Sequence, residues 1–212
     1  MLSEKTAEVL KQFFLQREKF EQMVASMHPQ DLAKALSEVL WLYANDKNSS
    51  TLREWVVLQV AGCQPEPGKI GYNGYRGNTP YEVKPRNVRS DEEKRKRLNG
   101  DGNFTDFTYE RLEKYLRDGA RVLIAGFVDG NLIYVLEVPF ESLYDALKRQ
   151  LDRHFGGERP PGRYLRSANF SFRDYANDTK VQCLFLHPQW QDFADFLSHD
   201  FRSYLARFEG RW

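Results

Sequence analysis

An acidic residue and a lysine stand two positions apart in residues 79–84, which read Thr-Pro-Tyr-Glu-Val-Lys. Side chains two residues apart on a β-strand point to the same face, so we expect Glu82 and Lys84 to project together while Tyr81 and Val83 pack behind them. A carboxylate beside an ammonium on a rigid strand can hold a divalent cation and orient a water molecule against a phosphodiester. The segment therefore predicts metal-dependent hydrolysis.

The spacing alone is weak evidence, because an acid two residues before a lysine occurs three times, at Glu82/Lys84, Glu92/Lys94 and Asp178/Lys180. The second pair lies in the charged run 90–97 and the third in an expected turn. The first pair alone combines an extended context, Pro80 at its entry, Pro85 as an expected stop and a glycine-rich hairpin before it. This context makes residues 79–84 the candidate site.

Length and composition favour a folded chain with one domain. The 212 residues carry a net charge of +1, which does not by itself indicate a nucleic-acid partner. We find no apolar run long enough to span a bilayer and no pattern typical of a secretory signal at the N-terminus. Cys63 and Cys183 lack metal-ligand spacing, so we expect buried free thiols. Together these features predict a cytoplasmic protein without membrane association.

Hydrophobic periodicity predicts helices alternating with hairpins, and hence a mixed α/β fold with a mixed central β-sheet flanked by helices. Asp129-Gly130 is the strongest short hairpin signal. We expect a single domain over 1–212, with an N-terminal helical part (1–48), a catalytic core (50–140) and C-terminal helices and strands (141–212). The expected helices are 4–27, 30–44, 52–62, 108–118, 142–155 and 189–208. The expected strands are 69–72, 79–84, 121–128, 131–138, 164–173 and 180–187, with 98–108 irregular.

This organisation, with the Glu82-Val-Lys84 strand, resembles the PD-(D/E)xK nuclease superfamily, and type II restriction endonucleases in particular. The resemblance covers roughly residues 50–140. It implies a restriction-endonuclease-like core, cleavage of double-stranded DNA at a short specific sequence, and a homodimer. In that family a helix with a glutamate precedes a hairpin whose aspartate and Glu-x-Lys hold one or two Mg²⁺ ions and position the attacking water.

Carried over to this chain, the resemblance makes Glu82 a metal-binding carboxylate and Lys84 the catalytic ammonium. Glu54 matches the helix glutamate. Its alternative is the carboxylate of a capping box with Thr51, because acidic residues are favoured in a first helical turn.

The chain departs from the family where the aspartate is expected, since Asn73 followed by Gly74 stands there. An amide oxygen can ligate a cation but lacks the charge that strengthens binding of hard cations. Glu66, which follows Pro65, is one alternative ligand. A second alternative is that Asn73 is an engineered Asp-to-Asn substitution. A third is that Asn73-Gly74 is only an ordinary tight turn. We favour Asn73 as the site position, natural or engineered.

Polar and basic side chains that could contact DNA occur in four groups, of which the first is the turn 75–78 beside the proposed site. The basic stretch 84–97 could line a phosphate-binding groove, or be a solvated loop. Residues 99–108 could lie against DNA or form an ordinary connector. Residues 164–173 could present polar side chains to DNA or form an ordinary exposed strand face. The predicted DNA-binding residues are Tyr75, Arg76, Asn78, Arg86, Asn87, Arg89, Asn99, Asp101, Asn103, Thr105, Arg166, Ser167, Asn169 and Arg173.

Two other functions compete with a restriction endonuclease. One is a repair or junction-resolving nuclease of the same superfamily, and the other is a catalytically inactive DNA-binding or protein-interaction domain. Motifs for serine hydrolases, nucleotide-binding loops and zinc sites are missing from the sequence. A nuclease requires the Glu82–Lys84 surface to open onto a groove that admits a duplex, so a pair buried beneath a helix would argue against it.

Overall fold

The computed structural model describes residues 3–15, 17–44, 50–66, 71–92 and 96–210. The chain divides into two compact units, residues 1–52 and 53–212. The division falls close to the expected end of the N-terminal helical part. The first unit contains α1 (Glu4–Leu15), α2 (Arg17–Ala25) and α3 (Pro29–Ala44), so the helix expected over 4–27 is two helices.

The apolar spacing over 30–44 predicts a helix that buries Leu32, Leu36, Val39, Leu40 and Tyr43, but α3 leaves most of these side chains exposed. Leu32, Leu36, Leu40 and Tyr43 are 41%, 57%, 46% and 41% exposed, whereas Ala35 is buried. These four exposed residues follow one stripe of the helix, because they are spaced by four, four and three positions. The helical prediction was right and the burial prediction was wrong.

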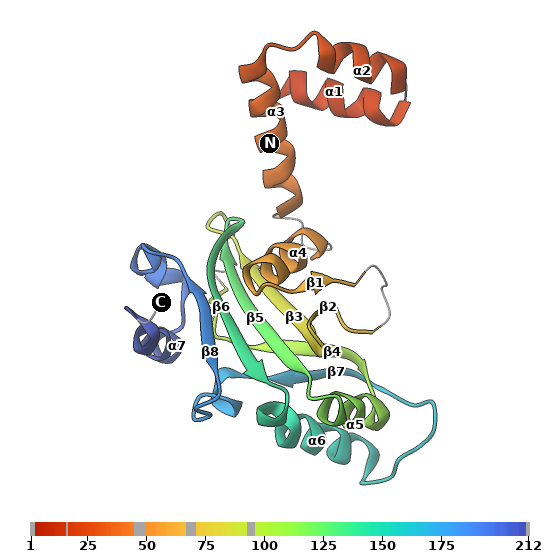
Figure 1. The fold of residues 1–212 in the computed structure, drawn as a ribbon, viewed down its shortest axis with the longest axis vertical. Coiled ribbons are helices and arrows are strands. Elements are labelled where there is room, and N and C mark those ends of the chain that lie inside the picture. Colours follow the sequence, from red (N-terminus) through yellow and green to blue (C-terminus); the bar gives the residue numbers. More distant parts are fainter. Residues whose placement is uncertain (1–2, 16, 45–49, 67–70, 93–95, 211–212) are drawn as a thin grey trace. The chain divides into compact units, whose positions relative to one another are not determined.

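The second unit is built on a mixed six-stranded sheet (Figure 1). Its strand order is β1-β2-β3-β5-β6-β8, and β3 and β5 run parallel while the other neighbours are antiparallel. The parallel pair requires a crossover, which α5 supplies. The strands are β1 (Gln64–Pro65), β2 (Gly74–Arg76), β3 (Thr79–Val88), β5 (Arg121–Val128), β6 (Asn131–Pro139) and β8 (Gln182–Leu186). The predicted mixed α/β class is confirmed.

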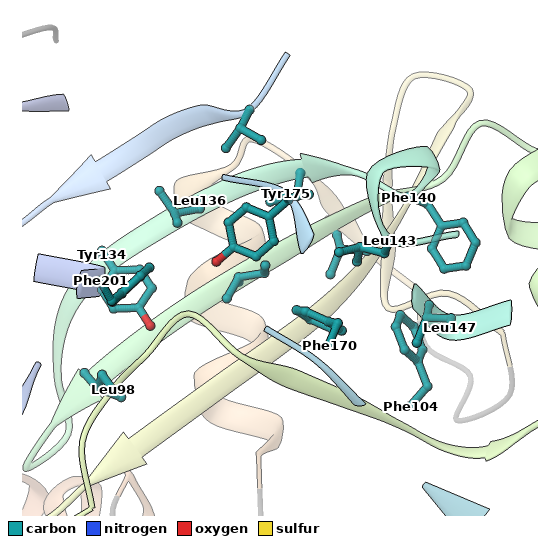
Figure 2. Packing of buried hydrophobic residues seen from close by; sticks show 14 of the residues in the cluster. Leu98, Phe104, Tyr134, Leu136, Phe140, Leu143, Leu147, Phe170, Tyr175 and Phe201 are labelled. Carbon is teal, nitrogen blue, oxygen red and sulfur yellow. The ribbon is translucent and has the colours of Figure 1, made fainter. Parts of the chain in front are cut away.

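Helices cover the two faces of this sheet, and the core accordingly has two parts. The smaller part joins α4 (Thr51–Val60), through Val57 and Leu58, to Tyr81 and Val83 of β3. The larger part joins the other face to α5 (Tyr109–Arg117) and α6 (Glu141–Phe155), and includes Phe104. Figure 2 shows Phe104, Phe140, Leu143, Leu147 and Phe170 gathered in this larger cluster. The alternation along β3 thus sends Glu82 toward α5 and its neighbours toward α4.

A two-stranded ribbon completes the larger core. It pairs β4 (Gly102–Phe107) with β7 (Leu165–Phe170) antiparallel, and Figure 1 shows it running across the strands of the large sheet. The expectation of irregular structure over 98–108 was therefore wrong for most of that stretch. Its pairing partner lies about sixty residues further along, which no local pattern in 98–108 reveals.

Two further expectations differ from the structure. β3 continues to Val88 past Pro85, because β2 pairs only as far as Tyr81 and leaves an edge where a residue without an N–H is tolerated. The helix expected over 189–208 is broken at Leu197, which forms a β-bridge with Leu98. In its place the chain forms a 3₁₀ helix (Trp190–Phe196), α7 (His199–Leu205) and a second 3₁₀ helix (Ala206–Phe208). The strand expected over 69–72 lies partly outside the described residues.

Candidate active site

Glu82 and Lys84 lie together on one face of β3, as predicted. The Lys84 Nζ atom is 2.6 Å from Glu82 Oε1. Tyr81 and Val83 belong to the core on the opposite face, also as predicted. The alternation of the strand is therefore sufficient to bring the carboxylate and the ammonium together.

Helix α5 contributes two further donors to the same carboxylate. The Tyr115 hydroxyl donates to Glu82 Oε2 at 2.7 Å, and the Arg111 guanidinium donates to Oε1 at 3.3 Å. The two residues are four apart, so they share one face of the helix, and Arg111 also donates to the Tyr115 hydroxyl at 2.9 Å. The Thr108 hydroxyl accepts from the Arg111 backbone N–H at 3.1 Å and caps the helix start.

The apolar spacing over 108–118 predicts a core-facing stripe of Tyr109, Leu112, Tyr115 and Leu116, and this pattern does not point to Arg111. An arginine four residues before a tyrosine on an otherwise core-facing helix was the available signal. A partly buried arginine favours an acidic partner, and a search for that partner leads to Glu82.

Burial and charge fix the protonation of the donors. Burial, followed by the negative charge of Glu82, raises the pKa of Tyr115 far above the usual tyrosine value, so its hydroxyl stays protonated and donates. Burial disfavours the charged form of Arg111, but Tyr115 and Glu82 outweigh it and raise the pKa of the guanidinium. Glu82 is therefore a buried carboxylate held by two cations and one hydroxyl.

The expectation that this pair opens onto a groove is not met. Glu82 is 5% exposed and lies beneath Tyr115 and Arg111 of α5. The Lys84 side chain is 16% exposed, and its ammonium sits 4.4 Å from the centre of the Phe104 ring. Tyr115 is held over the carboxylate because its ring packs against Tyr72 and Phe140, at 4.7 and 5.0 Å between centroids.

Asn73 lies beside β3 but is engaged with the backbone and with α4. Its backbone N–H donates to the Tyr81 carbonyl at 2.9 Å, and its Oδ1 accepts from the Val83 N–H at 2.7 Å. Its Nδ2 donates to Glu54 Oε2 at 3.1 Å. The structure thus brings Asn73 and Glu54 together at the edge of the strand that carries Glu82.

The alternatives for this position are also placed. Asn73 extends the β2–β3 pairing, while the tight turn of the hairpin lies further on, at Gly77 with φ +60°. Glu66 is exposed, and its backbone N–H donates to the Asn73 carbonyl at 2.9 Å. Glu66 therefore lies next to Asn73 because their backbone groups pair.

The residues present fit a divalent cation only in part. Glu82 and Glu54 offer the carboxylate oxygens that Mg²⁺ prefers. The Asn73 oxygen, however, is taken by the Val83 N–H, and both Glu82 oxygens already accept hydrogen bonds. Within the described ranges no group of three or more His, Cys, Asp and Glu residues could hold a metal ion.

The residues of the β2–β3 hairpin predicted to contact DNA have different surroundings. Tyr75 packs partly buried against the Tyr72 ring, 6.1 Å between centroids, and Asn78 is exposed at the turn. The Arg76 guanidinium donates to both oxygens of Glu137 at 2.9 Å and to the Ala61 carbonyl at 3.1 Å. Arg76 thus has an internal partner that the sequence did not suggest.

Beyond Lys84 the polar residues of β3 are tied to neighbouring loops. Arg86 pairs with Asp101 at 2.7 Å, and the Asn87 side chain accepts from the Gly130 N–H at 3.0 Å. Arg89 bonds Asp91 through its Nε at 2.9 Å. Of the basic run, Lys94 and Arg95 lie outside the described residues, whereas Lys96 and Arg97 are exposed. These contacts leave the predicted roles in DNA binding as predictions.

Most of the other predicted DNA-binding residues meet on the β4–β7 ribbon. Asn103 pairs with Asn169 and Thr105 with Ser167 across the ribbon, and all four side chains are exposed. Asp101 precedes β4, and the Asn99 amide faces its carboxylate. Arg166 is exposed on β7, while Arg173 follows that strand and pairs with Asp200 at 3.1 Å.

A second buried carboxylate, Glu137 of β6, lies on the opposite face of the sheet. It is 1% exposed and accepts hydrogen bonds from Arg76 and from the Tyr81 hydroxyl, the latter at 3.0 Å. The Arg121 guanidinium lies against the same carboxylate. Sequence reasoning missed this group, although a glutamate inside an apolar strand is a signal that a buried charge has partners.

Comparisons with known proteins do not assign a family. No family model matches the chain, and no curated protein matches it in sequence. The functional argument therefore depends on the geometry of the site.

Proposed function

We propose that this chain hydrolyses phosphodiester bonds of double-stranded DNA at a short specific sequence, as a type II restriction endonuclease does. The observation that carries the proposal is the cluster of Glu82, Lys84 and Arg111 at the junction of β3, α5 and the β4–β7 ribbon. It combines a potential proton acceptor with two cations. The parallel β3–β5 pair with a helical crossover is compatible with a restriction-endonuclease-like core.

The chemistry assigned to these side chains follows from their charges. Lys84 and Arg111 would bind the phosphate and stabilise the negative charge that develops on its oxygens. A phosphate that draws these cations away from Glu82 would free one carboxylate oxygen to accept a proton from the attacking water. The exchange would uncover Oε1, which Lys84 and Arg111 bind, while the neutral Tyr115 hydroxyl would stay on Oε2.

A Mg²⁺ ion remains part of the proposal as an expected cofactor. When bound, Mg²⁺ would neutralise charge on the phosphate and lower the pKa of a bound water. Glu82 and Asn73 would be its nearest ligands, with Glu66 as the alternative to Asn73. The hydrogen bonds described above must be rearranged first, which makes the dependence on Mg²⁺ a separate measurement.

The test is cleavage of supercoiled plasmid DNA of mixed sequence with Mg²⁺ or with EDTA. We expect discrete fragments from the parent protein, and at least about a 100-fold lower cleavage rate for Lys84→Ala. Lys180→Ala, which removes an exposed lysine paired with Glu141, is the matched control and should cut normally. Absence of cleavage by the given protein and by its Asn73→Asp variant would refute hydrolysis. Structure-selective nicking would favour a repair or junction-resolving nuclease instead.

A second candidate function is a DNA-binding domain that does not cut. The specific observation in its favour is Asn73, whose amide offers no free oxygen or charge at the position where the family has an aspartate. Asn73→Asp is the discriminating variant, because an aspartate there restores the second carboxylate. Cleavage by the aspartate form alone would identify a disabled nuclease. Inactivity of both forms with retained affinity for DNA would identify a binding module.

A homodimer is also part of the proposal. The stripe of Leu32, Leu36, Leu40 and Tyr43 on α3 is the kind of exposed apolar surface that mediates association. Leu36→Glu with Leu40→Glu should shift sedimentation from dimer to monomer, whereas Lys34→Glu on the same helix should not. A parent protein that sediments as a monomer would remove the dimer.

No helix in the described parts of the chain has the length and apolarity needed to cross a bilayer. A cytoplasmic location remains a proposal.

A further inference from the structure

The outer face of the β4–β7 ribbon gathers polar side chains from two distant segments. Asn103 and Thr105 come from β4, and Ser167 and Asn169 come from β7, where the register places them directly opposite one another. The inner face carries Phe104, Ala168 and Phe170, all buried, and Figure 2 shows the two phenylalanine rings within the core cluster. The ribbon therefore has a packed side and a continuous polar side.

Hydrogen bonds order the polar side. The Asn103 amide donates to Ser167 Oγ at 3.5 Å, and Ser167 Oγ donates to Asn169 Oδ1 at 3.3 Å. Gln150 of α6 binds the backbone of β7. Its Nε2 donates to the Asn169 carbonyl at 2.6 Å, and its Oε1 accepts a hydrogen bond from the Asn169 N–H at 2.8 Å. The Asn169 side chain therefore projects from a backbone position whose N–H and carbonyl are both bound by Gln150.

The chemistry of this face suits base edges better than phosphates. An asparagine amide can donate to and accept from the edge of adenine at once, and serine and threonine hydroxyls can pair with several bases. The charged residues next to them on the two strands are Asp106 of β4 and Arg166 of β7, both exposed. A face of four neutral polar groups has little to hold a phosphate by charge alone.

The ribbon is connected directly to the candidate site. Arg111 donates to the Thr105 carbonyl at 3.0 Å and to the Glu82 carboxylate at 3.3 Å. The Lys84 ammonium lies over the Phe104 ring on the inner face. A side chain at Gly102 would meet the Phe170 ring at 2.5 Å and Lys84 Cβ at 3.2 Å, so this glycine allows the close approach of ribbon and strand.

We propose that the β4–β7 ribbon enters the major groove of duplex DNA and reads base edges through Asn103 and Asn169, with Thr105 and Ser167 beside them. The major groove is wide enough for a two-stranded ribbon, and its donor and acceptor pattern distinguishes all four base pairs. The inference rests on the proposed function and names its recognition element. Arg111 would connect base recognition at Thr105 to the carboxylate of Glu82.

The test is selection of bound duplexes from a random-sequence pool in EDTA, followed by affinity measurements at several salt concentrations. For the given protein we expect an enriched short sequence. Asn103→Ala and Asn169→Ala should each relax the preference at one base pair by about 5- to 150-fold in affinity ratio, with an unchanged salt dependence. Asn177→Ala, at an exposed turn outside the ribbon, is the matched control.

Unchanged preference in both ribbon variants would overturn the inference while leaving cleavage of DNA possible. A selected sequence that the ribbon variants relax, from a protein that never cuts, would support the inference and remove the proposed hydrolysis. A parent protein that binds no duplex would overturn both. Circular dichroism of each variant establishes that a lost preference does not come from unfolding.

Discussion

Two buried glutamates on opposite faces of one sheet have nearly the same surroundings. Glu82 accepts hydrogen bonds from Lys84, Arg111 and Tyr115, and Glu137 is held by Arg76, Arg121 and Tyr81. Each carboxylate thus has two cations and one tyrosine hydroxyl. Saturation of a buried acid by donors is therefore no evidence of catalysis, because the same arrangement serves to join strands.

The difference lies in what surrounds each cluster. The partners of Glu137 come from β2, β3 and β5, so that this carboxylate ties four neighbouring strands together. The partners of Glu82 connect β3 to α5, and Arg111 extends the connection to the backbone of the polar ribbon. We infer that Glu137 stabilises the sheet, while Glu82 stands where a substrate on the ribbon would bring its phosphate.

The largest expected effect on stability comes from Glu137→Gln. Removing the charge leaves two guanidinium groups around a neutral amide, and breaking a buried pair in this way costs about 3–5 kcal/mol. Because the Arg76 and Arg121 side chains are 43% and 25% exposed, we expect a loss at or below this range. Urea unfolding at neutral pH measures it. Glu82→Gln should lose less, since fewer elements meet there, and equal losses would erase the distinction between the two clusters.

The two tyrosines sharpen the comparison with smaller changes. Tyr115→Phe and Tyr81→Phe each delete one hydroxyl bound to a buried carboxylate, at a cost of about 1–3 kcal/mol. Only Tyr115→Phe should also change plasmid cleavage, by about 10-fold, because it removes the donor that orients Glu82. Since the pKa of Tyr115 is raised, the cleavage rate should show no tyrosine titration up to about pH 10. Equal cleavage by both variants would separate Tyr115 from the site.

The smallest effect is expected at Asp101, which pairs with Arg86 beside the ribbon. Burial raises the pKa of Asp101, and the attraction of Arg86 opposes this only in part. A carboxyl with a raised folded-state pKa stabilises the protein below its unfolded-state pKa, and that contribution is lost as the pH rises through the folded value. Asp101→Asn should therefore gain slightly in stability over the parent between acidic and neutral pH. A stability difference that falls with pH would contradict this sign.

Local patterns were sufficient for part of this structure. The two-residue spacing placed Glu82 and Lys84 on one side of β3, and Asp129-Gly130 marked the hairpin, with φ +48° and +80° at its two residues. These features depend on neighbours within a few positions. The family resemblance named Glu54 and Asn73 as separate site residues, and the hydrogen bond between them was not predicted.

The features that were missed depend on residues far apart in the chain. The ribbon needs a partner for β4 that follows only after α5, two strands and α6, so residues 98–108 read as irregular. Glu137 finds Arg76 sixty-one positions earlier in the chain. Arg111 closes over Glu82 only because the α5 crossover returns to the strand. Charged residues inside apolar elements were the remaining clue, since each requires a partner.

Plasmid cleavage by Glu82→Gln and Glu137→Gln, compared at a temperature where both variants are folded, tests the central claim most directly. General-base removal costs about 10²- to 10⁴-fold, so the account predicts that loss for Glu82→Gln. It predicts parent-like cleavage by Glu137→Gln, whose carboxylate is bound by Arg76, Tyr81 and Arg121 of the sheet. Equal cleavage by the two variants would contradict the account, because Glu82 would then be a second structural carboxylate.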